Sequence, residues 1–468
     1  SVFFVLVVLE LLFRMAPSGS SATQMLRVAV VGGGPAGVIA GRFLAEAGHQ
    51  PVVLERGAAF GGVWSPNPVN RAVYQGLTSN IPKVVMQSFD LDFPAHLPSY
   101  IKSHDMGAYF RAYAEKFSLH RFVKFGANVL RVRPLRSTAE EELGDTAWSV
   151  SWRIGDLEET EVFDAVVVAN GHYEFPYTPE IPGQTRWLAE SPTPGARVVL
   201  HSSKYEPGDY SGKNVLVVGG RASAVDIARD LRRHAGWVYV LEKSCKRLQA
   251  VGNCTHLPLG ASIGADGHML FGETSVDGPP IDMIILATGY AYAYPFLNMK
   301  EVGLVVGRDE RCLSPLYLHA VHTLRPSLCF IGVPLAVPTP VQVMEAQSRF
   351  VASHLLSIRA LGSNAREARE VREARQEWVT KRMDVVGERH QDLHLLAGDT
   401  FEYVKQLVKE SGVATTEFEE FCRRLTVVEH VYADRVARAQ KRPWEDDDFR
   451  LVEYSVNWSD GSFTVSKL

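Results

Sequence analysis

Residues 27–37, with the sequence RVAVVGGGPAG, decide the fold of this chain. A short run of mainly β-branched residues ends in a glycine-rich turn, and residues 38–47 continue with the periodicity of a helix. The run QPVVL at residues 50–54 then predicts a second strand, which ends at Glu55. A strand, a glycine turn, a helix, a strand and an acidic residue in this order predict a unit that binds a dinucleotide.

The glycines of this turn have different expected roles. Gly32 makes the tight turn, Gly34 lets backbone N–H groups approach a pyrophosphate, and Gly37 lets the helix pack on the strand. Glu55 follows at about the 20-residue distance at which an acidic side chain accepts hydrogen bonds from ribose hydroxyls. The alternative is a strand–helix turn that binds no ligand.

A second unit of the same kind follows later in the chain. The run KNVLVV at 213–218 leads into the turn GGRASA at 219–224, a helix follows, and WVYVL at 237–241 predicts the next strand. Arg221 replaces the second glycine and Ala224 the third. Alanine is tolerated at the third position. Arginine argues against a close backbone approach to phosphate, although its guanidinium could pair with the phosphate instead.

Basic residues just past this second unit indicate which coenzyme it binds. Lys243, Lys246 and Arg247 lie where a 2′-phosphate would be met. Together with Arg221 they predict NADPH rather than NADH. The alternative is a solvated basic turn that contacts no nucleotide.

Two further strand-like runs bracket the second unit and predict the domain organisation. DAVVVA at 164–169 and DMIIL at 282–286 both lead into small residues, which we expect to carry the chain from one nucleotide domain to the other and back. The predicted fold is α/β, with two dinucleotide-binding (Rossmann-like) domains, the NADP domain inserted into the FAD domain, and a charge-rich helical C-terminal segment. The expected parts are an N-terminal extension over 1–24 that need not be native, an FAD-binding domain over 25–170 and 291–468, and an NADPH-binding domain over 171–290.

Composition narrows the range of functions. The chain has 468 residues, with 49 Lys and Arg against 53 Asp and Glu, and a formal net charge of −4. This near balance argues against nucleic acid or an anionic membrane as a general partner. The five cysteines are widely spread without a CxxC pair, so neither a disulfide framework nor a metal site is expected.

The two ends of the chain carry segments that need separate interpretation. The apolar run Val2–Phe13, interrupted by Glu10, is shorter than the about 20 residues that span a bilayer, so no stable membrane span is expected. Either the natural start is Met15 or the run is a weak anchor. The final tripeptide Ser466-Lys467-Leu468 spells the peroxisomal address, which predicts a peroxisomal location and an import receptor as partner. The alternative is a solvated tail on a cytoplasmic protein.

Two dinucleotide sites on one chain can hold a flavin and a nicotinamide together, which favours hydride transfer followed by flavin chemistry. A disulfide reductase of this architecture needs a redox-active cysteine pair beside the flavin, but no cysteine precedes Cys245. Dioxygen needs no redox group from the protein, and we therefore expect it to be the electron acceptor.

A set of short segments is typical of one protein family. These segments are Gly32–Gly37, Glu55 with Gly61–Trp64, Leu77–Lys83, Asn170–His172 with Pro176, Pro179 and Pro182–Gly183, His201–Tyr205, Ala287–Tyr290 with Pro295–Leu297, and Glu345–Arg349. With them the chain resembles the flavin-containing monooxygenases, and among these the plant-type S-oxygenating branch. The resemblance covers residues 27–448.

One fingerprint of this family, FxGxxxHxxxY, is only partly kept. His201 and Tyr205 are present, whereas Gly195 and Arg197 stand where phenylalanine and glycine are expected. Relatives that perform Baeyer–Villiger ring insertion carry tryptophan at the position of Tyr205. The resemblance therefore favours oxygenation of a heteroatom over ring insertion.

The resemblance implies an oxidoreductase that uses FAD, NADPH and O2. NADPH reduces the flavin, oxygen adds to its C4a atom, and the resulting hydroperoxyflavin transfers one oxygen atom to a soft nucleophile, the sulfur of a small-molecule sulfide or the nitrogen of an amine. NADP⁺ stays bound and keeps water away, and no general base is required. The alternatives are an uncoupled NADPH oxidase that makes H2O2 and a non-catalytic FAD/NADP redox sensor.

The resemblance also implies roles for single residues. Asn80 is the expected catalytic residue, because a neutral amide beside the flavin ring can both donate and accept hydrogen bonds; its alternative role is to cap the turn before Pro82. Trp64 is either adjacent to the flavin or part of the core, and Tyr205 either faces the nucleotide or lies in the core. His201 is either a packing histidine or a ligand partner.

The complete expected sites combine both lines of reasoning. The expected FAD-binding residues are Gly32, Gly34, Pro35, Ala36, Gly37, Glu55, Arg56, Gly62, Val63, Trp64 and Asn80. The expected NADP-binding residues are Tyr205, Gly219, Arg221, Ala222, Ser223, Ala224, Lys243 and Thr288.

Overall fold

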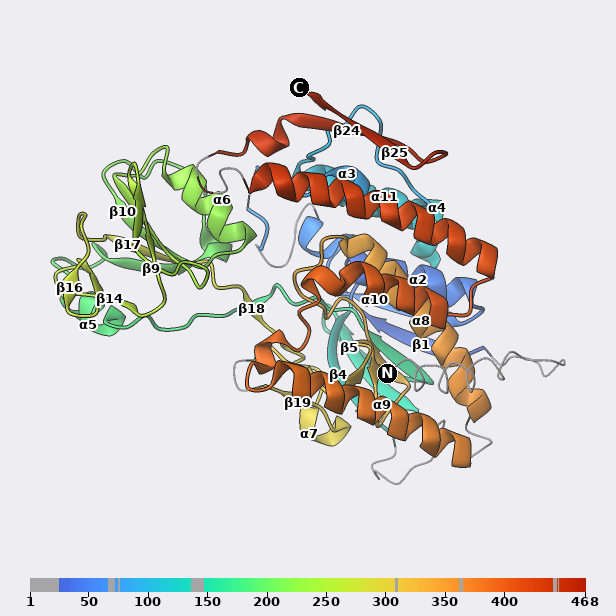
Figure 1. The fold of residues 1–468 in the computed structure, drawn as a ribbon. Helices are drawn as coiled ribbons and strands as arrows, with labels where there is room; N and C mark the ends of the chain where they lie inside the picture. The colour runs from blue at the N-terminus through green and yellow to red at the C-terminus, as the bar shows by residue number, and fades with distance from the viewer. Residues whose placement is uncertain are drawn as a thin grey trace.

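The computed structural model describes residues 25–65, 72–74, 76–135, 147–307, 310–361, 365–440, 444 and 446–468. The expected N-terminal extension over 1–24, and with it both interpretations of the first fourteen residues, lies outside the described residues. Two sheets built from different parts of the chain form two lobes, of which the second is drawn mainly in green (Figure 1). The prediction of an α/β fold with two dinucleotide-binding units is confirmed.

The first sheet has seven strands in the order β21-β22-β23-β7-β1-β2-β3. At its centre β1 pairs in parallel with β2 and β7. The valine-rich strands β1 and β7 are almost wholly buried because helices and a small sheet cover both faces. Its strands are β1 (Arg27–Val31), β2 (Gln50–Glu55), β3 (Val123–Phe125), β7 (Ala165–Val168), β21 (Leu316–Tyr317), β22 (Val321–His322) and β23 (Leu328–Phe330). The chain therefore returns to this sheet after building the second one.

The second sheet has six strands in the order β12-β13-β11-β10-β17-β9. Its strands are β9 (Val198–His201), β10 (Asn214–Val218), β11 (Trp237–Leu241), β12 (Gln249–Val251), β13 (Cys254–Leu257) and β17 (Met283–Leu286). A hairpin-like sheet of β14 (Ala261–Ile263), β15 (Met269–Phe271) and β16 (Thr274–Ser275) and the short helix α5 (Gln184–Ala189) complete this lobe. The two chain connections between the lobes run side by side, because β8 (Phe175–Pro176) pairs with β18 (Tyr290–Ala291).

Helices bury the faces of both sheets. In the first lobe α2 packs against α8, and α8 packs against α10, so that their apolar sides share one core with α4 and α11. In the second lobe α6 packs on β10 and β11. The helices are α2 (Pro35–Glu46), α3 (Lys83–Met86), α4 (Ser103–Lys116), α6 (Ala222–Leu231), α7 (Met299–Val302), α8 (Pro340–Leu361), α9 (Ala365–Val386), α10 (Thr400–Glu410) and α11 (Thr415–Ala439), with short 3-10 turns that include Gly62–Trp64 and Asp448–Arg450.

Smaller sheets complete the first lobe. An antiparallel sheet of β4 (Asn128–Pro134), β5 (Trp148–Ile154) and β6 (Leu157–Phe163) buries two tryptophans, and β19 (Val305–Val306) pairs with β20 (Leu313–Ser314). The chain ends in a hairpin of β24 (Val452–Asn457) and β25 (Ser462–Lys467), beside α11 (Figure 1). Among the described residues, no helix is both long enough and apolar enough to cross a membrane.

The C-terminal tripeptide belongs to this hairpin. Ser466 pairs with Glu453 and Lys467 with Val452, while the backbone N–H of Leu468 donates to the carbonyl of Leu451 at 3.1 Å. Reading by an import receptor would require these pairs to open. The peroxisomal location stays a prediction.

We expect Gly37→Ala to destabilise the first lobe by about 3 kcal/mol or more, the upper end of overpacking effects. The new Cβ would lie 1.8 Å from the carbonyl oxygen of Gly32, and backbone cannot rotate away as a side chain can. Thermal unfolding followed by circular dichroism measures the loss. Gly398→Ala, which places its Cβ in open space, is the control. Equal melting temperatures for the two variants would contradict the expectation.

Candidate functional site

The first glycine turn brings the end of β1 against the start of α2. Gly32 has φ 105° and donates its N–H to the carbonyl of Leu54 at 2.9 Å. The absence of a side chain at Gly37 lets α2 approach the backbone of Gly32. Gly34 is the N-cap of α2 and provides no side-chain cap, so the N–H groups of the first turn stay available for an anion.

Glu55 holds the same turn from the end of β2. Its side chain is buried, and its carboxylate accepts hydrogen bonds from the backbone N–H groups of Gly33, at 2.5 Å, and Gly57, at 2.6 Å. Arg56, the next residue, pairs with Glu174 at 2.7 Å. Both members of that pair line the cavity, so the charge of Arg56 is already matched by a carboxylate.

The second glycine turn repeats this arrangement between β10 and α6. Gly219 has φ 137° and donates its N–H to the carbonyl of Leu241 at 2.9 Å. A Cβ on Gly219 would lie 2.3 Å from the carbonyl oxygen of Ala287 and 3.4 Å from the Cβ of Ala224. Ala224 stands at the third position of the motif, beside this close backbone approach. Arg221 is the N-cap of α6 and makes no side-chain cap, so this helix start is also open.

One cavity of about 1490 Å³ lies between the lobes and receives both helix starts. Its size exceeds the about 300–1,000 Å³ of ordinary ligand pockets, so there is room for two dinucleotides, and two uncapped helix N-termini offer a seat for each pyrophosphate. No cysteine is among the cavity-lining residues that the structure describes. The expected site residues that line it are Gly32, Gly34, Pro35, Ala36, Glu55, Arg56, Gly62, Val63, Trp64, Asn80, Gly219, Arg221, Ala222, Ser223, Lys243 and Thr288.

Three expected binding residues do not line the cavity. Gly37 and Ala224 lie behind it, at the helix–strand contacts that shape the two turns. Tyr205 is 2% exposed, stacks on Tyr210, and donates its hydroxyl to Asp230 on α6. The expectation that Tyr205 faces the nucleotide is therefore not met, and its core alternative describes what the structure shows.

The positions of His201 and of the basic residues after β11 distinguish between the alternatives given for them. His201 is buried, with Nε2 hydrogen-bonded to the Gly289 carbonyl at 2.9 Å, as expected of a packing histidine. Of the basic residues expected around a 2′-phosphate, Arg221 and Lys243 line the cavity, whereas Lys246 and Arg247 are exposed and do not. Fewer basic residues thus line the cavity than the sequence indicates.

Asn80 lies on the loop before α3 and lines the cavity. The N-cap of α3 is Pro82, without a side-chain cap. The turn is held instead by Ser79, whose hydroxyl donates to the Ile81 carbonyl at 2.9 Å and accepts from the N–H of Ile101 at 3.1 Å. Within the described part of the chain the amide of Asn80 makes no hydrogen bond, so it is free to contact a ligand. The capping alternative is not what the structure shows.

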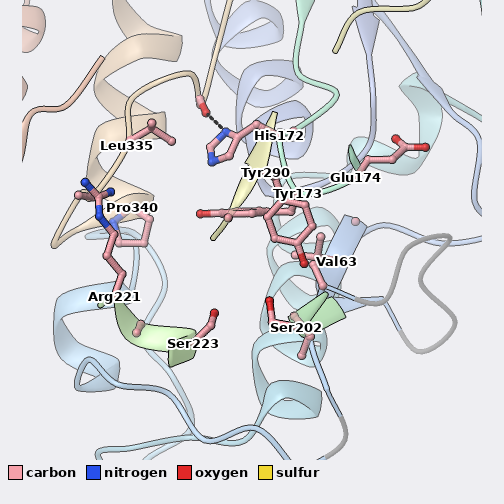
Figure 2. A pocket seen from close by; sticks show the side chains of 18 of the residues that line it. Val63, His172, Tyr173, Glu174, Ser202, Arg221, Ser223, Tyr290, Leu335 and Pro340 are labelled. Atoms are coloured by element: carbon pink, nitrogen blue, oxygen red, sulfur yellow. Dashed lines mark hydrogen bonds between the residues drawn. The ribbon is translucent and has the colours of Figure 1, made fainter. Parts of the chain in front are cut away.

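The residues after β7 and β17 contribute three rings that the expected site left out. His172 and Tyr173 follow β7, and Tyr290 follows β17; Figure 2 shows them beside one another. The rings of Tyr173 and Tyr290 meet edge to face with centroids 5.5 Å apart. The signal was present in the sequence, since both strands lead into short polar and glycine segments at the carboxyl edges of their sheets, where ligands bind in such folds.

His172 is held in one tautomer. Its Nδ1 lies 3.0 Å from the carbonyl oxygen of Gly332, which can only accept, so Nδ1 carries the proton (Figure 2). Burial lowers the pKa of His172 to about 4, and the carbonyl contact only partly opposes this. Its Nε2 is buried and finds no partner among the described residues, which leaves a neutral acceptor at the cavity wall.

Arg450 ties the lobes together beside this site. Its guanidinium, 11% exposed, lies 3.1 Å from the carboxylate of Asp226 on α6 and donates from Nε to the Ser79 carbonyl at 3.0 Å. Asp226 itself lines the cavity. One side chain from the C-terminal segment thus joins the second lobe to the loop that carries Asn80.

Two uncapped helix starts that open onto one cavity are typical of an oxidoreductase that binds two dinucleotides. The model of the family described as flavin-binding monooxygenase-like matches residues 25–249 and 265–417. The chain belongs to this family and is a flavin-containing monooxygenase.

Plant proteins are among the relatives of this chain. It is 34% identical over 375 residues to flavin-containing monooxygenase FMO GS-OX-like 2 of Arabidopsis thaliana, covering 73% of this chain and 76% of the relative. It is 29% identical over 480 residues to FMO GS-OX3 of the same plant, covering 95% and 96%. The structure of S-allyl-L-cysteine S-oxygenase from Allium sativum matches with a TM-score of 0.74 and 27% identity, covering 91% of this chain and 95% of that one.

We expect Arg450→Met to lower the melting temperature by several degrees, because it removes the cation of a largely buried pair, although Arg229 still neutralises Asp226. Hydrogen exchange of residues 77–81 should also become faster, since the Ser79 carbonyl loses its donor. Arg186→Met, which removes an exposed pair with Glu190, is the control and should change neither quantity. Unchanged exchange in the Arg450 variant would contradict the proposed tether.

Proposed function

We propose that this enzyme uses FAD, a reduced nicotinamide dinucleotide and O2 to oxygenate a small molecule at a soft nucleophilic atom, with thioether sulfur preferred over amine nitrogen. One observation carries the proposal: both dinucleotide seats open onto a single cavity whose described lining offers no cysteine to accept electrons. The similarity to the structure named S-allyl-L-cysteine S-oxygenase supports sulfur as the target.

The residues present fit both nucleotides. Gly32 and Gly34 with the open start of α2 would hold the FAD pyrophosphate, and Glu55 would accept from its ribose. The open start of α6 would hold the second pyrophosphate. When bound, the reduced flavin supplies electrons to O2 and so provides an electrophilic oxygen atom.

The chain's own contribution is to position the reactants and exclude water. Asn80 directs an amide free of other described hydrogen bonds into the cavity, where it can both donate and accept. Methionine and aromatic side chains such as Met86, Met106 and Phe110 form an apolar part of the wall that suits a thioether. The imidazole of His172 remains neutral and offers no acidic proton at neutral pH.

The proposal is tested with matched panels of thioethers, tertiary amines and ketones, scored by product mass and by the H2O2 formed for each coenzyme oxidised. We expect sulfoxide as the main product, with little H2O2, because a polarisable sulfur attacks an electrophilic oxygen readily. Lactone or ester from the ketones without sulfoxide would overturn the sulfur assignment. Coenzyme oxidation that yields only H2O2 would indicate an oxidase, and bound FAD without coenzyme oxidation would indicate a sensor.

We expect Asn80→Ala to retain FAD and to oxidise the coenzyme nearly as fast as the native enzyme, yet to form much less sulfoxide. Losing one preorganised hydrogen bond to a developing charge costs about 10²–10³ in rate, and the electrons should appear as H2O2. Asn80→Asp, which keeps the shape but not the N–H donor, should behave similarly. Asn457→Ala, on the exposed hairpin, is the control. An unchanged ratio of sulfoxide to H2O2 would show that Asn80 does not act on the reacting oxygen.

A further inference from the structure

The two dinucleotide units match each other residue by residue at the ends of their strands. In the first, Val31 pairs with Leu54, and the N–H of Gly32 donates to the carbonyl of Leu54 at 2.9 Å. In the second, Val218 pairs with Leu241, and the corresponding N–H donates to the Leu241 carbonyl at 2.9 Å. The residue after Leu54 is Glu55. The residue after Leu241 is again a glutamate.

This glutamate, Glu242, also takes the place of Glu55 in space. An added Cβ on Gly33 would lie 3.0 Å from Oε2 of Glu55, and one on Gly220 would lie 3.0 Å from Oε2 of Glu242. Glu242 is 6% exposed and lines the cavity. Each glycine turn therefore has a carboxylate beside it, at the position where a dinucleotide's adenosine ribose is met.

Glu242 is held in its charged form. Burial would raise the pKa of Glu242, but hydrogen bonds from His256, at 3.0 Å, and Ser244, with the charge of the imidazolium, outweigh burial and lower it. The pKa of His256 rises to about 9, because hydrogen bonds and charge interactions with Cys254 and Glu242 outweigh its burial. His256 does not line the cavity and packs against the Trp444 ring, with centroids 4.9 Å apart. The carboxylate of Glu242 therefore faces the cavity, and the imidazole of His256 lies behind it.

The basic residues that line the cavity do not offset this carboxylate. Arg221 also lines the cavity, and its charge acts on Tyr173, whereas the pKa of Glu242 is set by burial, His256 and Ser244. Lys243 lines the cavity but is exposed, and an exposed ion pair contributes little to binding.

We propose that Glu242 determines coenzyme specificity, and that it selects a dinucleotide with a free 2′-hydroxyl, NADH, over one with a 2′-phosphate, NADPH. The inference rests on the proposed function only in that the second unit binds a nicotinamide coenzyme. At contact distance a carboxylate accepts hydrogen bonds from a ribose 2′-hydroxyl, whereas its oxygens repel those of a 2′-phosphate, even though the imidazolium of His256 behind it reduces the net charge. This proposal departs from the preference for NADPH that the basic residues in the sequence predict.

Binding to the FAD-loaded, oxidised enzyme tests this without turnover. Isothermal titration with NAD⁺ and NADP⁺ should give tighter binding of NAD⁺ by about 10- to 100-fold, the range for hydrogen bonds to a charged group. ADP-ribose and 2′-phospho-ADP-ribose, which lack the nicotinamide, should show the same preference, because the discrimination lies at the adenosine ribose.

Two variants identify the residue. Glu242→Gln keeps the shape and removes the charge, and Glu242→Ser also opens space; both should lower the NAD⁺ to NADP⁺ affinity ratio by about tenfold or more. Glu273→Gln, at an exposed turn of the same lobe and away from the cavity, should leave the ratio unchanged. FAD content and melting temperature confirm that each variant is folded.

The outcomes separate this inference from the proposed function. Tighter binding of NADP⁺ by the native enzyme, an unchanged ratio in the folded Glu242→Gln variant, or failure to bind either nucleotide would overturn the role of Glu242. Selective NAD⁺ binding by an enzyme that forms no sulfoxide would support that role and overturn S-oxygenation. Sulfoxide formation with NADPH but not with NADH would support S-oxygenation and overturn the role of Glu242.

Discussion

The close contact between two stretches of backbone is the constraint on which the rest of the structure depends. Because Gly37 has no side chain, α2 starts directly against the end of β1, and its uncapped N–H groups point into the cavity. Gly219 allows the same approach to Ala287 in the second lobe. The absence of a Cβ, rather than any added binding group, therefore creates the open helix start at which a dinucleotide can bind. Side chains such as Glu55 then only need to be placed at the ends of neighbouring strands, where the parallel register brings them.

Residues far apart in the sequence give the cavity its shape. The paired connections β8 and β18 fix the separation of the lobes on one side, and Arg450 joins Asp226 to Ser79 on the other. Oxygen transfer requires water to be kept away while the reactants are held together. A link that acts on both lobes and on the Asn80 loop at once couples their positions, and this coupling depends on the C-terminal segment.

The glycine turns, the strands around them and the order of the domains follow from local patterns, so the sequence is sufficient to predict them. The orientation of single side chains is not local. An aromatic residue at Tyr205 could face either way, and the choice depends on Asp230, which α6 brings beneath it. The lysines after β11 likewise suggest a phosphate site until the fold shows which of them reach the cavity. Glu242 could have been found, because the repeat of strand, turn, helix, strand and acid is visible in both units.

Several titratable groups around the cavity are neutral or paired, and this fits the proposed reaction, in which stray protons would be harmful. Glu55 accepts from two backbone N–H groups, Glu242 is paired with His256, and Arg56 is paired with Glu174. His172 stays neutral well below physiological pH because burial disfavours its cation. Near neutral pH His172 therefore keeps one protonation state, and in the proposed reaction the amide of Asn80 would be the polar group that steers oxygen. The proposed oxygenation requires no catalytic acid or base from the chain, since its residues would control access and orientation while the bound nucleotides would supply the reactivity.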